Sequence, residues 1–542
     1  MNVLTTAYLE NEQTIVENIL RARGIDDFET FLNPKLVDWF LPFESIPNLK
    51  EAAEEVVNNI DNTGTFFLSV DSDTDGITSG TIMYRWLWHH YRQKQHFFED
   101  SPIKWYVSQG KSHGTSERLI EQIEEMKPDI LIVMDSLDSN CENYQRIRDL
   151  GTKIIVLDHH DIRDGIPYDD VVTLVSSNRS DNKALSGAGV VWKFCLYLDY
   201  LMGENDYTLN NYTDLAAVGL IADMMDMSAT SMENRAIVNY GLEHMQSMAI
   251  KKIIGSYKFN ANSIVFSIAP LINAACRYFE NNEAFRAFIE DADDKRRMSI
   301  NCLKRCKKAQ KSDIEYIKEN IVDQIESQID NPFFFLVINT EYGIAGLIAN
   351  QLMAQYHKPT FVVVKRNNQY QGSGRSNGVD LRKISHDIVP SAKAYGHPQA
   401  FGFFLDQDYL KEFSEQLSEK LADVPVIASD VIDCEIDTDS ITHELIDLVH
   451  EIDRITGQEF RPVKFMVETD GLELSVSNSG KHLKFLDSNG FLFVKWNAAE
   501  EINNLNDFDE SKKVRLIGSL DKGFLDKSYN LRMVVDKYEV LD

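Results

Sequence analysis

Carboxylate and imidazole side chains gather at a few points in the first half of the chain, most of them directly after short apolar runs. The residues are Asp71, Asp73, Asp75, Asp135, His159 and Asp223. Hard divalent cations prefer carboxylate oxygens, and imidazole nitrogens shift the preference toward Mn²⁺. Two cations about 3.5–4 Å apart can share a carboxylate and a water, lower the pKa of that water and stabilise the charge of an attacked phosphate. The residue types therefore predict a two-metal phosphoesterase site, with Mn²⁺ preferred and Mg²⁺ as the alternative.

Three apolar runs must position these side chains. The runs are residues 66–70, 130–134 and 154–157. Short apolar runs bounded by turn and helix signals are typical of buried parallel strands. The runs end on Asp71, Asp135 and Asp158, respectively. Because ligands in open α/β sheets bind beyond the carboxyl ends of the strands, we expect these acids to converge at one edge of one sheet.

Each acidic motif taken alone has an ordinary explanation. The string Asp71-Ser-Asp-Thr-Asp75-Gly could be a solvated loop or a lone Ca²⁺ loop. A calcium hand needs a glutamate at its twelfth position, which is Ile82 here. The string Asp158-His159-His160 could be a helix cap at a strand-to-helix turn. Both motifs at consecutive strand ends favour the metal site over these alternatives.

Length and composition indicate a multidomain protein outside the membrane. The 542 residues exceed what one hydrophobic core usually supports, so we expect about two to four domains. No basic leader precedes an apolar segment, and no run is long enough to span a bilayer. Six cysteines without a CxxC pair favour a reduced, cytoplasmic setting. The formal charge of −30 argues against nonspecific duplex binding over a broad surface but permits a locally basic groove.

The pattern of apolar runs divides the chain into five segments. They are a helical extension (1–60), an α/β domain with a parallel sheet (61–250), a helical connector with a long charged helix (251–325), a smaller α/β domain (326–425) and a β-rich terminal domain (426–542). In the smaller domain, Gly372-Ser-Gly-Arg-Ser376 is predicted to be a flexible turn. In the terminal domain, Ser488-Asn489-Gly490 predicts a hairpin. The fold class is therefore α/β with an added β domain.

Four motifs occur in the order found in DHH phosphoesterases, and the chain resembles the RecJ single-strand-specific exonucleases over nearly its full length. The motifs are Asp71-Ser-Asp-Thr-Asp75-Gly, Asp135 after an apolar run, Asp158-His-His160 and Gly219-Leu-Ile-Ala-Asp223. Further matches are Leu20-Arg-Ala-Arg-Gly24, Leu185-Ser-Gly-Ala-Gly189, the segment 270–277, the segment 372–376 and Gly396-His397. The resemblance implies a DHH catalytic domain at 61–250, a DHH-associated domain at 326–425 and an OB-like nucleic-acid-binding domain at 426–542.

The resemblance also implies a role for each candidate residue near the metals. The two ions would be ligated by Asp71, Asp73, Asp75, Asp135, His159 and Asp223, with Asp135 between them. Asp158 would orient a neighbouring histidine, and His160 would face the scissile phosphate or the leaving oxygen. Asn273 and Arg277 would hold the phosphodiester, because an arginine fork suits two phosphate oxygens.

Two further groups of residues are expected to bind the strand. A terminal 5′-phosphate would be held by hydroxyls, backbone N–H groups and a guanidinium from Ser373, Gly374, Arg375 and Ser376, with His397 beside them. A second group, on one face of a predicted helix, comprises Arg297, Lys304, Lys308 and Lys311. This face is predicted to contact phosphates, and a solvated helix face is the alternative.

Three departures from the family pattern concern how the substrate is held. Ser136-Leu137 follows Asp135 where the family usually has a glycine two places on, and Cys276 stands where a glycine is common. Residues 107–114 only loosely resemble the arginine-containing Gly-Tyr-Gly loop of the family. No expected metal ligand is lost by these changes.

The sequence as a whole predicts an exonuclease that degrades single-stranded DNA from the 5′ end to 5′-mononucleotides, with a role in DNA repair and recombination implied by the resemblance. We expect a cytoplasmic monomer, with a single-strand-binding protein or a helicase as candidate partners. One alternative is a DHH phosphodiesterase for short oligonucleotides or cyclic dinucleotides, against which the terminal β domain argues. The other is an inactive DHH replication scaffold, which is disfavoured because every expected ligand position is filled.

Overall fold

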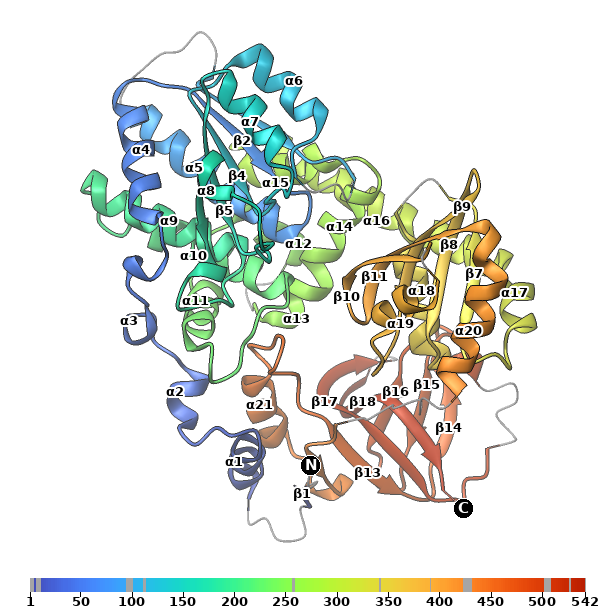
Figure 1. The fold of residues 1–542 in the computed structure, drawn as a ribbon. Helices are drawn as coiled ribbons and strands as arrows, with labels where there is room; N and C mark the ends of the chain where they lie inside the picture. The colour runs from blue at the N-terminus through green and yellow to red at the C-terminus, as the bar shows by residue number, and fades with distance from the viewer. Residues whose placement is uncertain are drawn as a thin grey trace. The chain divides into compact units, whose positions relative to one another are not determined.

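The computed structural model divides the chain into two compact units (Figure 1). The described residues are 4–5, 11–93, 101–110, 114–255, 259–340, 343–389, 391–422, 431–501, 508–525 and 528–541. The first unit comprises Met1–Tyr106, Gly114–Ala269 and Asp430–Asp542, and the second comprises Val107–His113 and Pro270–Ser429. These units are coarser than the five segments predicted from the sequence, whose boundaries stay predictions.

A five-stranded sheet in the first unit carries the acidic motifs. Its strands lie in the order β3 (Ile103–Val107), β2 (Phe66–Val70), β4 (Ile130–Met134), β5 (Lys153–Asp158) and β6 (Thr173–Ser176). β2 pairs with β4, β4 with β5 and β5 with β6, each in parallel. Every residue of β2 and β4 is buried, as expected of parallel strands that are covered on both faces. The three strands predicted from the apolar runs are therefore confirmed.

The direction in which strands are added reverses between β2 and β4. After β2 the chain forms the edge strand β3, and it then returns past β2 to form β4, β5 and β6. In doubly wound sheets, ligands bind beyond the carboxyl ends of the strands at such a reversal. Asp71 directly follows β2 and Asp135 directly follows β4. The sheet topology thus brings two of the acidic motifs to its expected binding edge.

Helices cover both faces of this sheet. α6 (Glu117–Met126) and α7 (Cys141–Asp149) share a hydrophobic core with one face. Its buried members include Phe67, Leu119, Ile123, Leu131, Tyr144, Ile147 and Val156. α5 (Thr74–Gln93) packs on β2, α9 (Gly187–Met202) packs on β5, and α10 (Tyr207–Ala222) packs on both helices. Each fully buried Leu, Ile or Phe side chain stabilises the fold by about 1.5–3 kcal/mol, so the strand ends are held by a rigid layer.

The N-terminal helices pack against the same unit through buried charged side chains. They are α1 (Glu12–Ala22), α2 (Phe28–Leu32), α3 (Leu36–Trp39) and α4 (Leu49–Asp61). The buried Arg235 guanidinium lies 3.6 Å from the ring centroid of Phe31 and donates a hydrogen bond to Phe31 O. Buried Lys193 donates to Leu41 O and to Glu233. Both contacts join the extension to α9 and to α11 (Met232–Glu243).

The second unit is built on a smaller five-stranded sheet. Its order is β10 (Lys393–His397), β11 (Ala400–Asp406), β9 (Gln369–Arg375), β8 (Thr360–Arg366) and β7 (Phe334–Ile338). β7 and β8 are parallel, and the other three neighbouring pairs are antiparallel. The long helix α16 (Asp293–Asn320) precedes the sheet, as predicted for the connector, and shares a core with α18 (Ala345–Tyr356). α19 (Leu381–Ile388) and α20 (Leu410–Ala422) contribute to a second core.

The glycine- and serine-rich string at residues 372–376 is not a turn, so that prediction was wrong. Its first four residues lie in β9, which pairs with β8 on one side and with β11 on the other. A Cβ atom at Gly372 would lie 2.1 Å from Val362 O, and one at Gly374 would lie 2.4 Å from Phe401 Cζ. The glycines therefore allow close packing inside the sheet rather than a reversal of the chain.

An eight-stranded mixed sheet forms most of the terminal domain. Its order is β1 (Leu4–Thr5), β12 (Cys434–Glu435), β13 (Phe465–Thr469), β17 (Val514–Leu525), β18 (Ser528–Val540), β16 (Leu492–Lys495), β15 (Leu483–Leu486) and β14 (Glu473–Val476). β15 and β16 are antiparallel. Between them, Asp487 accepts hydrogen bonds from Asn489 N and Phe491 N, and Gly490 has a φ of 83°. The predicted hairpin and the β-rich character of this domain are confirmed.

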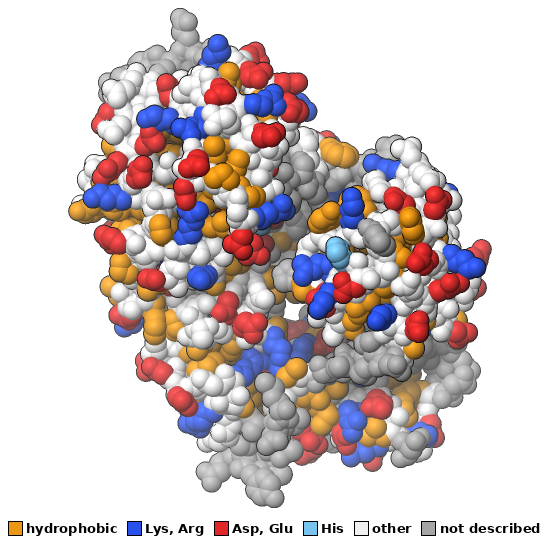
Figure 2. Space-filling model, in the orientation of Figure 1, with side chains coloured by type: hydrophobic (Ala, Val, Ile, Leu, Met, Phe, Trp, Pro, Cys, Tyr) orange, Lys and Arg blue, Asp and Glu red, His pale blue; other side chains and the backbone are white. Residues whose placement is uncertain are grey.

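Two further features concern the charge on the surface and the apolar character of the helices. On the face drawn in Figure 2, acidic and basic side chains are interspersed and form no broad basic area. Among the described helices, none is both long enough and apolar enough to cross a bilayer.

Candidate metal centre

The acidic motifs meet beyond the carboxyl ends of β2, β4 and β5. His159 Nε2 lies 3.1 Å from Asp135 Oδ1. It also lies 3.5 Å from Asp223 Oδ2 and 3.8 Å from Asp75 Oδ2. The donor atoms form three groups, each within 4.8 Å, which are Asp75–His159–Asp223, Asp71–Asp73–Asp135 and Asp135–Asp158–His159–His160. The structure thus brings all eight residues together, while their roles as ligands stay predictions.

Asp135 is one of the fully buried acids of this cluster. Its side chain is only 2 % exposed, and its φ of 57° lies in the left-handed region that a residue with a Cβ rarely adopts. Its Oδ1 accepts no hydrogen bond from any described residue. A buried polar atom normally has a hydrogen-bond partner, so a carboxylate oxygen that accepts no hydrogen bond, on a strained backbone and beside the His159 ring, fits a residue held for a cation. Asp135 is also shared by two of the three groups, which fits the predicted bridging position.

The start of α9 holds Asp75. Gly187 N donates to Asp75 Oδ2 at 2.6 Å, and Ala188 N donates to Oδ1 at 3.1 Å. Ser186 caps the helix by accepting a hydrogen bond from Gly189 N. Two amide donors at the positive end of a helix dipole orient a carboxylate and favour its negative charge. This contact explains why a Ser-Gly-Ala-Gly string accompanies the acidic motifs.

Two glycines leave room for the carboxylates. A Cβ atom at Gly187 would lie 2.7 Å from Asp135 Oδ1, and a Cβ atom at Gly219 would lie 2.2 Å from Asp75 Oδ1. Both distances are too short for a side chain, so any other residue would displace a carboxylate. The segments around these glycines match family motifs in the sequence, but the sequence alone assigns the glycines no role. Their function as spacers emerges only from the packing of α9 and α10 against the strand ends.

Asp158, which is fully buried, and His160, which is half exposed, form an ion pair beside the cluster. Asp158 accepts hydrogen bonds from His160 Nδ1 at 2.8 Å, from His160 N at 2.8 Å and from Leu137 N. Burial opposes the charge of Asp158, but the His160 hydrogen bond and the charges of both histidines outweigh it and lower the pKa of Asp158 to about 2. Burial likewise opposes the charge of His160, yet Asp158 raises the pKa of His160 to about 9. Asp158 therefore orients His160 and keeps its ring protonated at neutral pH.

The remaining members carry more negative charge than the protein alone can compensate. Burial, followed by the charges of Asp75 and Asp73, raises the pKa of Asp223 to about 8. The same causes raise the pKa of Asp135 well above its ordinary value. Burial lowers the pKa of His159, which leaves a neutral imidazole suited to ligation. Crowded carboxylates with a neutral imidazole match the donor set of two hard divalent cations.

The residues that depart from the family pattern near Asp135 still support the site. Ser136 Oγ accepts a hydrogen bond from Gly114 N at 2.8 Å and donates to Asp71 Oδ1 at 3.4 Å. Leu137 N donates to Asp158, and the Leu137 side chain packs against the core of the sheet. The substitution of Leu137 for the usual glycine is therefore accommodated without displacing an acid.

A second group of predicted residues lies in the second unit, around three basic side chains. Arg277 donates to Asn273 O at 2.7 Å and to Gly343 O at 3.1 Å. Burial, followed by the charge of Arg277, lowers the pKa of Arg375 and also that of Lys307. Arg277 is therefore close enough to repel both Arg375 and Lys307, and such a group of cations is suited to bind an anion. Lys307 was not among the site residues predicted from the sequence, although it lies in the basic run that also contains Lys304 and Lys308.

Ser373 and Arg375 lie on the same face of β9, next to the start of α18. A Cβ atom at Gly346 would lie 2.7 Å from Arg375 Nη2 and 3.0 Å from Ser373 Oγ. The predicted contribution from backbone N–H groups was wrong, because β9 is an internal strand whose backbone pairs with β8 and β11. The side chains and the helix start, not a turn, would hold a phosphate here.

The other predicted strand-binding residues have separate positions. Ser376 Oγ donates to Val379 O at 2.7 Å and is buried, and the side chain of His397 lies outside the described residues. The predicted basic face of α16 is exposed, and it comprises Arg297, Lys304, Lys308 and Lys311. Arg297 pairs with Asp293 at 3.2 Å. These residues stay predictions as strand contacts.

Cys276, which replaces a common glycine, contacts the loop that also departs from the family pattern. Cys276 Sγ donates to Gly110 O at 2.6 Å, and Asn281 Nδ2 donates to Ser108 O at 2.8 Å. Residues 111–113 of this loop lie outside the described part of the chain. The two departures are therefore linked, because the thiol anchors the start of the altered loop.

Two segments of the chain match described protein families. Residues 65–220 match the DHH family, N-terminal domain, and residues 330–423 match the DHHA1 domain. The first segment contains all acidic motifs except Asp223, and the second contains β7 to β11. The matches agree with the order of motifs in the sequence.

Named relatives and solved structures align with most of the length of this chain. It is 28 % identical over 446 residues to YorK of Bacillus subtilis, a putative SPbeta prophage-derived single-strand DNA-specific exonuclease, covering 75 % of this chain and 74 % of that protein. It is 26 % identical over 482 residues to the single-stranded-DNA-specific exonuclease RecJ of Bacillus subtilis, covering 84 % of this chain and 56 % of that protein. RecJ of Thermus thermophilus in complex with Mn²⁺ has a TM-score of 0.76 at 21 % identity, covering 99 % of this chain and 77 % of that chain. The structural likeness establishes the fold.

Proposed function

We propose that this chain, which matches the DHH family and the DHHA1 domain over two segments and has the fold of RecJ, is a hydrolase that degrades single-stranded DNA from the 5′ end to 5′-mononucleotides. The observation that carries the proposal is the convergence of carboxylates and imidazoles within 4.8 Å around Asp135 and His159. RecJ of Bacillus subtilis is named a single-stranded-DNA-specific exonuclease, and YorK a putative one, which supports the choice of substrate.

Six side chains would hold two divalent cations. They are Asp71, Asp73, Asp75, Asp135, His159 and Asp223. When bound, the cations would lower the pKa of a shared water and stabilise the charge of the scissile phosphate. The carboxylate oxygens suit Mn²⁺ and Mg²⁺ equally, and the imidazole of His159 favours Mn²⁺.

His160 would act on the strand rather than on a cation. Its side chain is 48 % exposed, whereas that of His159 is 11 % exposed. Because Nδ1 is hydrogen-bonded to Asp158, Nε2 is the atom that can face the strand. The hydrogen bond with Asp158 raises the pKa of His160, which favours a protonated ring. Nε2–H could then donate to the scissile phosphate or to the leaving 3′-oxygen.

The basic group in the second unit would recognise the 5′-phosphate. Arg375 and Ser373 lie beside the start of α18, and Arg277 and Lys307 add positive charge. An arginine fork binds two phosphate oxygens at once. A protein that holds a terminal phosphate attacks only the end of a strand, which would explain the release of single nucleotides.

The terminal domain would bind single strands by stacking. Trp496 is 38 % exposed, with the His482 ring 4.6 Å away and the Arg532 guanidinium 5.2 Å from its ring centroid. Exposed aromatic rings beside cations bind unstacked bases, at about 1–3 kcal/mol per base. Single-strand binding beyond the active site fits an exonuclease better than an enzyme for dinucleotides. The predicted monomer, and the predicted helicase and single-strand-binding partners, stay predictions.

A time course on end-labelled DNA tests the proposed function. Single- and double-stranded substrates with either 5′-phosphate or 5′-hydroxyl ends are incubated with Mn²⁺, Mg²⁺ or EDTA. We expect mononucleotides from the 5′ end of the single strand, faster with the 5′-phosphate, and none in EDTA. Degradation from the 3′ end, or equal rates on duplex, would contradict the proposed polarity or strand preference. Cleavage confined to dinucleotides would instead indicate a small-substrate phosphodiesterase.

A further inference from the structure

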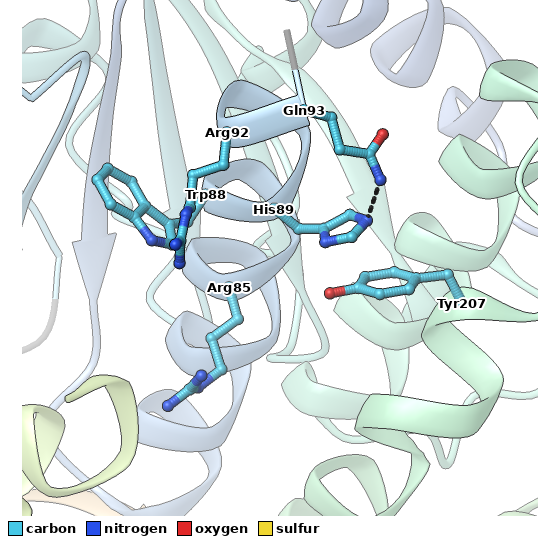
Figure 3. Close-up of a pocket in the computed structure, with 6 residues that line it drawn as sticks. All are labelled: Arg85, Trp88, His89, Arg92, Gln93 and Tyr207. Atoms are coloured by element: carbon cyan, nitrogen blue, oxygen red, sulfur yellow. Dashed lines mark hydrogen bonds between the residues drawn. The ribbon is translucent and has the colours of Figure 1, made fainter. Parts of the chain in front are cut away.

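An aromatic and basic pocket lies on α5 and α10, within the first unit (Figure 3). The cavity has a volume of about 300 Å³ and is lined by Arg85, Trp88, His89, Arg92, Gln93 and Tyr207. Five of these residues come from the last turns of α5, and Tyr207 begins α10. None of the six belongs to the metal-ligand cluster or to the basic group of the second unit.

The α5 residues of the pocket form one stripe along the helix. They are Arg85, Trp88, His89 and Arg92, at spacings of three, four and seven residues, which places them on one face. Trp86, Leu87 and His90 are buried on the opposite side. A solvated helix face normally mixes acids with bases, but this stripe holds two guanidinium groups and two aromatic rings and no carboxylate. The chain has 85 acidic and 55 basic residues, so the stripe runs against its overall composition.

The rings of the pocket are held in place by one another. The His89 and Tyr207 rings are stacked at 3.9 Å with an interplanar angle of 19°. Gln93 Nε2 lies 2.6 Å from His89 Nε2. Trp88 is stacked on Tyr84 at 6.4 Å with an angle of 8°. Figure 3 shows Arg85 and Arg92 pointing to the side of α5 that carries Trp88, with His89 directed toward Tyr207.

We propose that this pocket binds one nucleotide unit of single-stranded nucleic acid, with its phosphate between Arg85 and Arg92 and its base on Trp88. The inference rests on the proposed nuclease function and adds a second contact for the same strand. Guanidinium forks suit phosphate oxygens, and the face of an indole stacks with any base. A volume of about 300 Å³ lies at the small end of ligand sites, which fits one nucleotide and not a folded polymer.

Two carboxylates near the imidazole of the pocket favour its positive charge, whereas burial and Arg92 oppose that charge. Burial lowers the pKa of His89, and Glu204 and Asp199 oppose that shift. Asp199 accepts hydrogen bonds from Trp86 Nε1 at 2.7 Å and from Thr208 N at 2.6 Å. The phosphate is assigned to Arg85 and Arg92 because their guanidinium groups are always charged and suit phosphate oxygens.

The pocket is separate from the point of cleavage. Arg85 and Arg92 follow Asp75 by 10 and 17 residues along α5, which is roughly 15 and 25 Å at about 1.5 Å per residue. At about 3.4 Å per stacked nucleotide, a strand needs roughly four to seven nucleotides to reach from one to the other. Long substrates therefore use the pocket, and a trinucleotide does not.

Binding measurements on the full-length protein in EDTA test the pocket without cleavage. The probe is a 3′-fluorescein oligothymidylate long enough to span both sites, followed by anisotropy. We expect Arg85→Gln/Arg92→Gln and, separately, Trp88→Ala each to weaken binding about tenfold. The charge-matched control is Lys50→Gln/Arg118→Gln, two exposed residues of the same unit outside the pocket, which should bind like the unaltered protein. Unaltered binding by both pocket variants, or an equal loss in the control, overturns the proposal.

Fluorescence quenching identifies the source of the nucleotide. A tryptophan signal that thymidine 5′-monophosphate quenches, and that Trp88→Phe abolishes, shows that a free nucleotide fills the pocket. A Trp88-dependent quench by the oligonucleotide alone shows that the pocket needs a strand. Absence of any Trp88-dependent quench with either probe refutes the site. Cleavage in Mn²⁺ is scored separately: an unaltered protein that binds the strand but cleaves nothing refutes the proposed function and leaves the pocket intact.

Discussion

Gly187 provides the sharpest test of how the metal centre is built. Replacement by alanine would place a Cβ atom 2.7 Å from Asp135 Oδ1, while the Gly187 amide holds Asp75 Oδ2 at 2.6 Å. Relief of that clash must move a carboxylate or the start of α9. Changes to groups that orient metal ligands typically weaken metal binding about 10- to 100-fold. We therefore expect Gly187→Ala to lose about 1.4–2.7 kcal/mol of binding free energy for Mn²⁺.

The stability of the metal-free protein should change much less than its affinity for Mn²⁺. Overpacking costs about 1–3 kcal/mol, and alanine is preferred over glycine in a helix by about 1 kcal/mol. The free energy of unfolding in EDTA should therefore fall by about 0–2 kcal/mol. In saturating Mn²⁺, the free energy of unfolding should fall further, by the amount of Mn²⁺ binding free energy that is lost. This follows because a bound ligand stabilises the folded state by an amount that depends on the logarithm of its concentration divided by its Kd.

Gly189→Ala is the matched control for this experiment. Gly189 lies two residues further along the same helix turn, and a Cβ atom there would meet only the Leu185 side chain, at 3.0 Å or more. Calorimetric Mn²⁺ titration and urea unfolding with and without Mn²⁺ are compared for the three proteins. If Gly187→Ala binds Mn²⁺ like the unaltered protein, or if Gly189→Ala loses as much, the assigned packing around the carboxylates is incorrect.

Three further predictions follow from the same geometry. Asp135→Ala should abolish Mn²⁺-dependent cleavage without unfolding the protein, because it removes a buried carboxylate whose charge is unfavourable without a cation; circular dichroism and the nuclease assay check both parts. In EDTA, the raised pKa values of Asp223 (about 8) and His160 (about 9) mean that the folded state keeps protons that the unfolded chain has released. Stability should therefore fall as the pH rises from about 4 to about 9, and Mn²⁺ should remove the part due to Asp223; a flat urea midpoint in EDTA would contradict this. Lys307→Gln should reduce the preference for 5′-phosphorylated over 5′-hydroxyl DNA several-fold. Replacement of Lys308, its exposed neighbour on α16, by glutamine should leave that preference unchanged. The ratio of kcat/KM for the two kinds of end measures the preference.

Local sequence patterns were sufficient for the framework of the metal centre. Apolar runs at 66–70, 130–134 and 154–157 predict strands without knowledge of the rest of the chain, since a parallel strand must be buried on both faces. The acids that follow them converge because parallel strands share one carboxyl edge. These acids were recognised as one set because the order of their motifs resembles that of one family. The same reasoning failed at residues 372–376, where glycines in a strand were interpreted as a turn.

Contacts between distant segments were decided only by the tertiary structure. Nothing local distinguishes His159 from His160, but packing buries one ring among carboxylates and leaves the other half exposed beside Asp158. Composition placed Lys307 in a basic run, but only the helix position on α16 puts it near Arg277. The pocket on α5 likewise depends on Tyr207, which lies more than a hundred residues further along the chain. The spacing of apolar residues is visible among neighbours in the sequence, and it predicts helices and strands. The distances between side chains on different elements instead depend on how those elements pack.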